Sequence, residues 1–143
     1  MINDFDIDDY FSLREFQCPC CGVVMVDPML VESLHELRVA RGRVVIKRGG
    51  GFRCLAYQKA IHISRAELLQ KKPKEPIIAA HTLGQAADVR IISLETGEGI
   101  PLTNDDIPYL KGLGFNGIGI GKTGWAHLDI AHSDEPATWS YDY

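Results

Sequence analysis

The stretch His81-Thr82-Leu83-Gly84-Gln85-Ala86-Ala87-Asp88-Val89-Arg90-Ile91-Ile92 joins a short glycine-containing segment to a run that alternates with a period of two. Successive side chains of a β-strand point to opposite faces of the sheet. The alternation therefore predicts a strand whose core face carries Val89 and Ile91. Asp88 and Arg90 share the opposite face, and we expect the fold to form around this strand.

Two further strands are predicted over 115–121 and 125–130. The first alternates glycine with isoleucine, so its isoleucines face the core and its other face is bare backbone. The second places Trp125, His127 and Asp129 on one face, opposite an apolar face. We predict that the three strands share one sheet and present a glycine-floored substrate groove.

Helices are predicted over 27–41, 55–69 and 107–113, and a short β-branched strand over 44–47. In the first helix Asp27 is the expected N-cap, and Pro28 suits the first turn. The 143 residues are most simply one domain, spanning 1–143. The predicted fold class is α+β, with a central antiparallel sheet and helices packed on one side.

Charge and hydropathy narrow the expected partners. The formal net charge is −4, with acidic residues bunched near the N-terminus, which gives no basic field for nucleic acid. No run reaches membrane-spanning length, and the N-terminus lacks a positive segment followed by an apolar one. We expect a monomer without nucleic-acid or membrane partners, made in the cytoplasm without a signal peptide.

The four cysteines are clustered early in the chain, at Cys18, Cys20, Cys21 and Cys54. In a reducing compartment they remain thiols. They are open to two interpretations, a structural metal site or buried and loosely paired thiols. The run Cys-Pro-Cys-Cys-Gly does not show the two-pair CxxC spacing that makes a metal site a strong prediction.

His81, Asp88 and His127 offer two imidazoles and one carboxylate on segments predicted to share a face. A catalytic zinc uses three protein ligands and one open position for water, whereas a structural zinc is closed by four ligands. Each residue alone is explained as a polar side chain beside a sheet. Together they predict a Zn²⁺ site. Arg53 follows three glycines, and its planar fork suits a carboxylate or a developing oxyanion.

The order His81-x-x-Gly84-x-Ala86-x-Asp88 followed by Trp125-x-His127-x-Asp129 resembles the zinc peptidases of the D-alanyl-D-alanine carboxypeptidase type, the peptidase M15 group, related in fold to hedgehog domains. Small members of this group are frequent in bacteriophages and prophages and act on peptidoglycan stem peptides. The likeness covers nearly the whole chain, through Phe16-x-Cys18, the Pro28 helix with its Leu-x-x-Leu-Arg end, Gly51 to Cys54, Gly114 to Gly119 and Trp139-x-Tyr141.

The resemblance implies that His81, Asp88 and His127 are zinc ligands, with water in the fourth position. It also makes Arg53 the counterpart of the arginine in the family's Ser-Gly-Tyr-Arg motif, which holds the substrate carboxylate or stabilises the oxyanion. The local sequence here is Gly-Gly-Phe-Arg, ending at Arg53, so the serine is absent.

Two other positions depart from the family pattern. The serine expected two residues before the first histidine ligand is Ala79, and the acid expected three residues before the last one is Gly124. Asp129, on the same predicted strand face as His127, is then the nearest carboxylate. We expect it to support the site or to serve as the general base.

The expected function is therefore that of a zinc metallopeptidase which cleaves peptidoglycan stem peptides as a carboxypeptidase or an endopeptidase. Such a protein acts on the cell wall, either as an endolysin released at lysis or as part of a virion. A non-catalytic wall-binding or virion structural module is the alternative, because the acid at Gly124 is missing. A generic zinc amidase comes third, because the ligand triad does not define which amide is cut.

Overall fold

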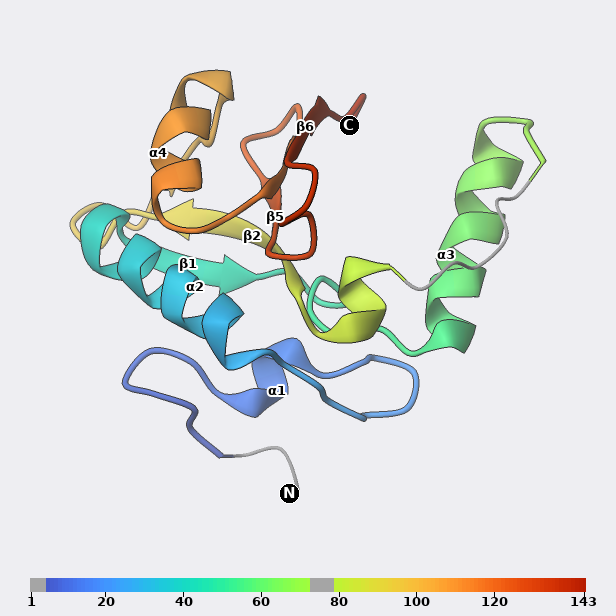
Figure 1. Cartoon of the computed structure of the whole chain (residues 1–143), viewed down its shortest axis with the longest axis horizontal. Helices are drawn as coiled ribbons and strands as arrows, with labels where there is room; N and C mark the ends of the chain where they lie inside the picture. Colours follow the sequence, from blue (N-terminus) through green and yellow to red (C-terminus); the bar gives the residue numbers. More distant parts are fainter. Residues whose placement is uncertain (1–4, 73–78) are drawn as a thin grey trace.

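The computed structural model describes residues 5–72 and 79–143, and within them it shows an α+β fold with a six-stranded, mostly antiparallel sheet (Figure 1). The strand order is β1-β2-β5-β4-β6, and β3 pairs with β2 off this path. The predicted class and central sheet are confirmed. The strands are β1 (Arg43–Ile46), β2 (Ala86–Ile92), β3 (Gly99–Ile100), β4 (Gly117–Ile120), β5 (Ala126–Asp129) and β6 (Ala137–Ser140). The helices are α1 (Leu13–Phe16), α2 (Pro28–Arg41), α3 (Leu55–Leu68) and α4 (Ile107–Gly112), with 3-10 turns η1 (Ala80–Leu83) and η2 (Asn104–Asp106).

Strand β2 lies inside the sheet, between β1 and β5, and its alternation follows the prediction. Val89 and Ile91 are fully buried in the core. Asp88, on the opposite face, is also buried, because that face is covered by other parts of the chain. The sheet therefore has a hydrophobic face and a second, enclosed polar face.

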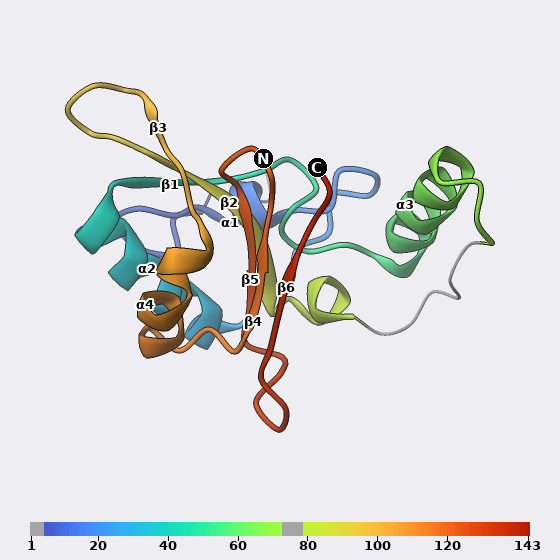
Figure 2. The ribbon, with the colours of Figure 1, turned by 90° about the horizontal axis from the view of Figure 1, so that it is seen from above.

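The hydrophobic face is covered by α2 and α4, which lie on the same side of the sheet in Figure 2. Helix α2 begins as predicted, since the Asp27 carboxylate accepts a hydrogen bond from the backbone N–H of Met29 at 2.9 Å and Pro28 occupies the first turn. Its buried stripe is Leu30, Val31, Leu34 and Leu37, which joins Leu110 of α4 in the core.

Helix α3 stands apart from this layer, at the opposite end of the molecule from α4 (Figures 1 and 2). It buries only Gln58 and Ala66, and Leu55 and Leu68 are exposed. Its contribution to the hydrophobic core is consequently small. None of the helices in the described ranges is long and apolar enough to cross a membrane.

The glycine face of β4 is not the open floor that the sequence predicts. Strand β6 pairs with β4 in parallel and brings aromatic rings over it. A side chain on these glycines would overlap others already there, namely Asp129 over Gly117, Trp139 over Gly119 and Trp125 over Gly121. The expected glycine floor is therefore wrong, although a pocket does lie on this face of the sheet. The glycines instead give a carboxylate and two indoles the room to pack flat against the sheet.

Candidate metal centre

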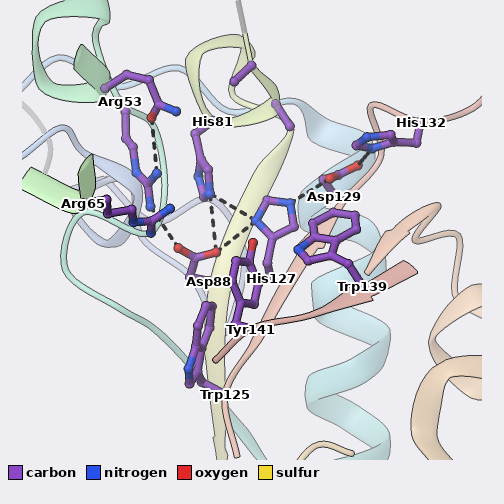
Figure 3. A pocket seen from close by; sticks show the side chains of 13 residues that line it. Arg53, Arg65, His81, Asp88, Trp125, His127, Asp129, His132, Trp139 and Tyr141 are labelled. Atoms are coloured by element: carbon purple, nitrogen blue, oxygen red, sulfur yellow. Dashed lines mark hydrogen bonds and ion pairs between the residues drawn. The ribbon is translucent and has the colours of Figure 1, made fainter. Parts of the chain in front are cut away.

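Three buried polar side chains meet at one point on the covered face of the sheet (Figure 3). His81 comes from η1, just before β2, and Asp88 lies on β2. His127 lies on β5 directly opposite Asp88 in the antiparallel register. Each is less than a tenth exposed. The shared sheet face predicted from alternation is confirmed. Gly84, the C-cap residue of η1, has a left-handed backbone (φ 68°) that turns the chain from His81 into β2.

The three nearest atoms form a compact triangle. Nδ1 of His127 lies 3.2 Å from Nε2 of His81 and 3.0 Å from Oδ1 of Asp88, and the third side, from Nε2 of His81 to Oδ1 of Asp88, is 3.4 Å. A tetrahedral ion with bonds of about 2.0–2.1 Å would hold its ligand atoms roughly 3.3 Å apart. The triangle therefore has the size of one face of such a coordination sphere.

The outward nitrogens of both imidazoles are already hydrogen-bonded to acceptors. Nδ1 of His81 donates to the carbonyl oxygen of Gly51 at 2.9 Å. Nε2 of His127 donates to Oδ2 of Asp129 at 2.7 Å. These contacts place the ring protons on the outside, so each neutral imidazole turns a lone pair toward Asp88. Three acceptors converging in a buried site need a proton or a metal ion between them, and this donor set fits a metal ion.

The electrostatics of the metal-free protein agree with this arrangement. Burial acts to raise the pKa of Asp88, but hydrogen bonds from His127 and His81 hold that pKa well below its usual range. Burial acts to lower the pKa of His127, but hydrogen bonds to Asp129 and Asp88 outweigh it and raise the pKa to about 9. Burial lowers the pKa of His81. At neutral pH without a metal, one proton on His127 therefore occupies the place of the cation.

Arg53 is brought to this centre, as the sequence predicts, but its contacts are with the protein. Its guanidinium donates to the carbonyl of Gly49 at 2.6 Å, to the amide oxygen of Gln58 at 3.2 Å and to Oδ2 of Asp88 at 2.9 Å. Oδ1 of Asp88 is left facing the two histidines. Arg53 thus fixes the orientation of a candidate ligand, and contact with a substrate stays a prediction.

The glycine loop before Arg53 holds the backbone of Asp88 as well. The N–H of Asp88 donates to the carbonyl of Gly50 at 2.8 Å, and the carbonyl of Asp88 accepts from the N–H of Lys47 at 2.9 Å. A Cβ on Gly50 would lie 2.9 Å from that of Asp88, closer than such atoms approach. The absence of a side chain at Gly50 therefore lets this loop lie directly against the strand that carries Asp88.

Asp129 lies behind His127, on the side away from His81 and Asp88 (Figure 3). Its side chain is fully buried and accepts from Nε2 of His127 at 2.7 Å, from Nδ1 of His132 at 2.8 Å and from the N–H of Ala131 at 3.0 Å. These contacts support the orienting role of Asp129. Its role as general base stays a prediction.

The centre opens into a pocket of about 260 Å³. Its aromatic wall comes from Trp125, Trp139 and Tyr141, with the Trp139 ring 5.2 Å from that of His127. β6 is an edge strand, and Trp139 on this strand and Tyr141 just after it enclose the site. Burial raises the pKa of Tyr141 to about 12, so its phenol stays protonated.

Sequence reasoning missed three lining residues, Gln58, Arg65 and His132. The signal for His132 was its position three residues after Asp129, which places histidines on both sides of one aspartate. The other two lie on α3, whose approach to the sheet no local pattern indicates. Arg90 lies two residues after Asp88 on β2, as predicted, but it donates to the carbonyl of Thr123 at 2.7 Å and does not line this pocket.

No family model matches this chain, and no match was found among curated proteins or solved structures. What the geometry establishes is a possible metal site formed by His81, Asp88 and His127, together with a second possible site at the four cysteines.

Proposed function

We propose that the protein is a zinc-dependent peptidase that hydrolyses peptide bonds in peptidoglycan stem peptides, as a D-alanyl-D-alanine carboxypeptidase or a murein endopeptidase. One observation carries this proposal. Three acceptor atoms converge beside an open pocket, and both imidazoles have their protons on the outward nitrogens. The resemblance to the peptidase M15 motifs supplies the substrate class.

Zinc is the ion that suits the donor set. Two imidazoles and one carboxylate at tetrahedral spacing, with one side facing a pocket, are the features of catalytic rather than structural zinc. When bound, zinc lowers the pKa of a water molecule and polarises the scissile carbonyl.

The protein's own residues hold and orient this centre. Arg53 fixes Asp88, Asp129 fixes His127, and the Gly51 carbonyl fixes His81. Such outer contacts set the direction of each ligand's lone pair.

Two pocket residues are suited to contact the substrate. Arg65 is exposed, lines the pocket from α3 and offers a cation to the terminal carboxylate of a stem peptide. Tyr141 keeps its phenolic proton and donates a hydrogen bond to the oxygen that gains negative charge. If Arg53 remains bound to Asp88, these two side chains take over the anion-binding role that the resemblance gives to Arg53.

Mass spectrometry of muropeptides after incubation with the zinc-loaded protein tests the proposal and identifies the bond cut. We expect a shortened stem peptide from the wild type and none from His127→Ala. Lys111→Ala, on the exposed side of α4, is the matched control and should retain activity. An intact substrate with the zinc-loaded wild type, or equal products from wild type and His127→Ala, would refute the assignment.

One observation favours a second candidate, a non-catalytic wall-binding or virion module. Among the pocket residues that the structure describes, both carboxylates are engaged, Asp88 by two histidines and Arg53, and Asp129 by His127, His132 and a backbone N–H. Both oxygens of each carboxylate already accept hydrogen bonds, which favours a module without a general base. Co-sedimentation with purified cell walls, without any change in the muropeptides and with binding preserved in Asp129→Ala, would favour this module over the enzyme.

A further inference from the structure

The four cysteines, far apart in the chain, come together at one end of α3. Cys18, Cys20 and Cys21 lie in the segment between α1 and α2, and Cys54 is the N-cap residue of α3. Their four sulfur atoms all lie within 4.8 Å of one another. The fold therefore brings the whole cysteine complement of the chain to a single point.

The sulfur spacing matches coordination of one ion. Sγ of Cys18 lies 3.6 Å from that of Cys20 and 3.7 Å from that of Cys54, and the Cys20 to Cys54 distance is 3.3 Å. A disulfide bond would bring two sulfurs to about 2.05 Å, and all four cysteines are free. Four thiolates around zinc, with bonds of about 2.3 Å, lie roughly 3.8 Å apart.

Burial does not account for the cluster. Unpaired cysteines usually gather as small hydrophobic side chains inside a core. Cys18 follows this rule, but Cys20 and Cys21 are exposed and Cys54 is only partly covered. Exposed thiols gain little from contact with each other, so a shared ligand explains their convergence better than packing does.

The backbone of residues 18–23, between α1 and α2, directs the thiols of this segment toward one point. The N–H of Cys18 donates to the carbonyl of Val23 at 2.9 Å, and the N–H of Gly22 donates to the carbonyl of Cys18 at 2.8 Å. Gly22 has a left-handed backbone (φ 73°), which a side chain would disfavour. Cys18 and Cys21 are separated by two residues, which is a sequence spacing common among zinc-binding cysteine pairs. The turn between them lets both thiols face the same point.

Cys54 completes the set from a position that favours a thiolate. Its sulfur accepts a hydrogen bond from the N–H of Tyr57 at 3.4 Å, at the N-terminus of the fourteen-residue helix α3. The partial positive charge of a helix N-terminus stabilises an anionic sulfur.

We propose that Cys18, Cys20, Cys21 and Cys54 bind one zinc ion in a closed, structural site. Four thiolates leave no open position for water, so this ion holds the fold together and does no chemistry. The proposal does not depend on the peptidase function, because it uses other residues.

This site would secure the segment that supports the other centre. Residues 51–54 connect the two: the Gly51 carbonyl holds His81, Arg53 holds Asp88, and Cys54 enters the thiol cluster. Helix α3, which follows, has few buried side chains of its own. A bound ion thus fixes the start of α3 and, through Arg53, the carboxylate of Asp88.

Cobalt substitution in reducing buffer distinguishes the two sites. Thiolate ligands give cobalt(II) a strong charge-transfer absorption that histidine and carboxylate ligands do not give. We expect this absorption in the wild type and in His127→Ala, and its loss in the double variant Cys20→Ser, Cys21→Ser. Val23→Ser, an exposed change in the same loop, is the control and should retain it.

Elemental analysis of protein purified in zinc-containing, reducing buffer supplies the count. We expect about two zinc ions per wild-type chain and about one in His127→Ala. Ellman's reagent should react with the thiols slowly until a chelator is added. The proposal is overturned if the cobalt-loaded wild type lacks thiolate absorption. It is equally overturned if all four thiols react fast with Ellman's reagent in the presence of zinc, or if elemental analysis finds iron in place of zinc. A mass of the native protein that shows a disulfide bond would overturn it as well.

Discussion

Replacing Asp129 by asparagine tests whether this carboxylate orients a metal ligand or takes part in proton transfer. The wild-type carboxylate accepts three N–H groups, from His127, His132 and Ala131, in a fully buried position. An asparagine has the same shape but only one acceptor oxygen, and its NH₂ group would face at least one of these donors. The imidazole of His127 then loses the anionic partner that makes its Nδ1 a stronger base.

Loss of such an outer partner typically weakens metal binding by about 10- to 100-fold, which is about 1.4–2.7 kcal/mol. We expect Asp129→Asn to raise the zinc dissociation constant by this factor, measured by competition with a chromophoric chelator. Activity at saturating zinc should fall much less. Asp134→Asn removes an equal charge from an exposed position in the next loop and should leave the affinity unchanged.

The reasoning is refuted by the opposite pattern. Unchanged zinc affinity in Asp129→Asn together with loss of nearly all turnover would mean that Asp129 handles a proton, and that its contacts with His127 and His132 are secondary.

Three further results are expected. The pKa of His127 is raised to about 9 in the metal-free protein, so zinc binding below that pH displaces one proton. The apparent affinity for zinc should therefore rise about tenfold per pH unit and level off above about pH 9. Calorimetry in buffers of different ionisation enthalpy measures the proton released. Arg53→Lys keeps the charge but cannot make all three guanidinium contacts, so urea unfolding of the metal-free protein should show a loss of about 1–3 kcal/mol. Gly119→Ala would drive a methyl group into the indole of Trp139 and should cost about 1–3 kcal/mol in thermal unfolding, whereas Gly112→Ala, with open space around it, should not destabilise the protein.

Much of the sheet was predictable because one of its faces is apolar. Val89 and Ile91 alternate with polar residues, and this period is a local property of the chain. The same alternation placed Asp88 and His127 on the non-core face of one sheet, whereas their direct pairing across β2 and β5 emerged only from the structure. His81, which lies on η1 and not on a strand, was found from its residue type and from the resemblance to the peptidase motif.

The parts that sequence reasoning missed depend on contacts between distant segments. Nothing local to Gly119 indicates that Trp139 covers it, since β6 pairs in parallel with β4 only after the chain has passed through β5. Arg53 was placed near the site, but its ion pair with Asp88 depends on how the glycine loop meets β2. The approach of Cys54 to the early cysteines is likewise a tertiary event, which spacing alone left open.

The segment 47–50, which is hydrogen-bonded to both the N–H and the carbonyl of Asp88, also affects the thermodynamics of metal binding. The amide hydrogen of Asp88 is bonded to Gly50 and its carbonyl to Lys47, so the main chain there is already ordered before any ion arrives. Little conformational entropy remains to be lost when an ion binds. The free energy of metal binding at this centre is therefore not reduced by a cost of ordering the backbone. The Asp88 amide should exchange with deuterium about equally slowly with and without the metal.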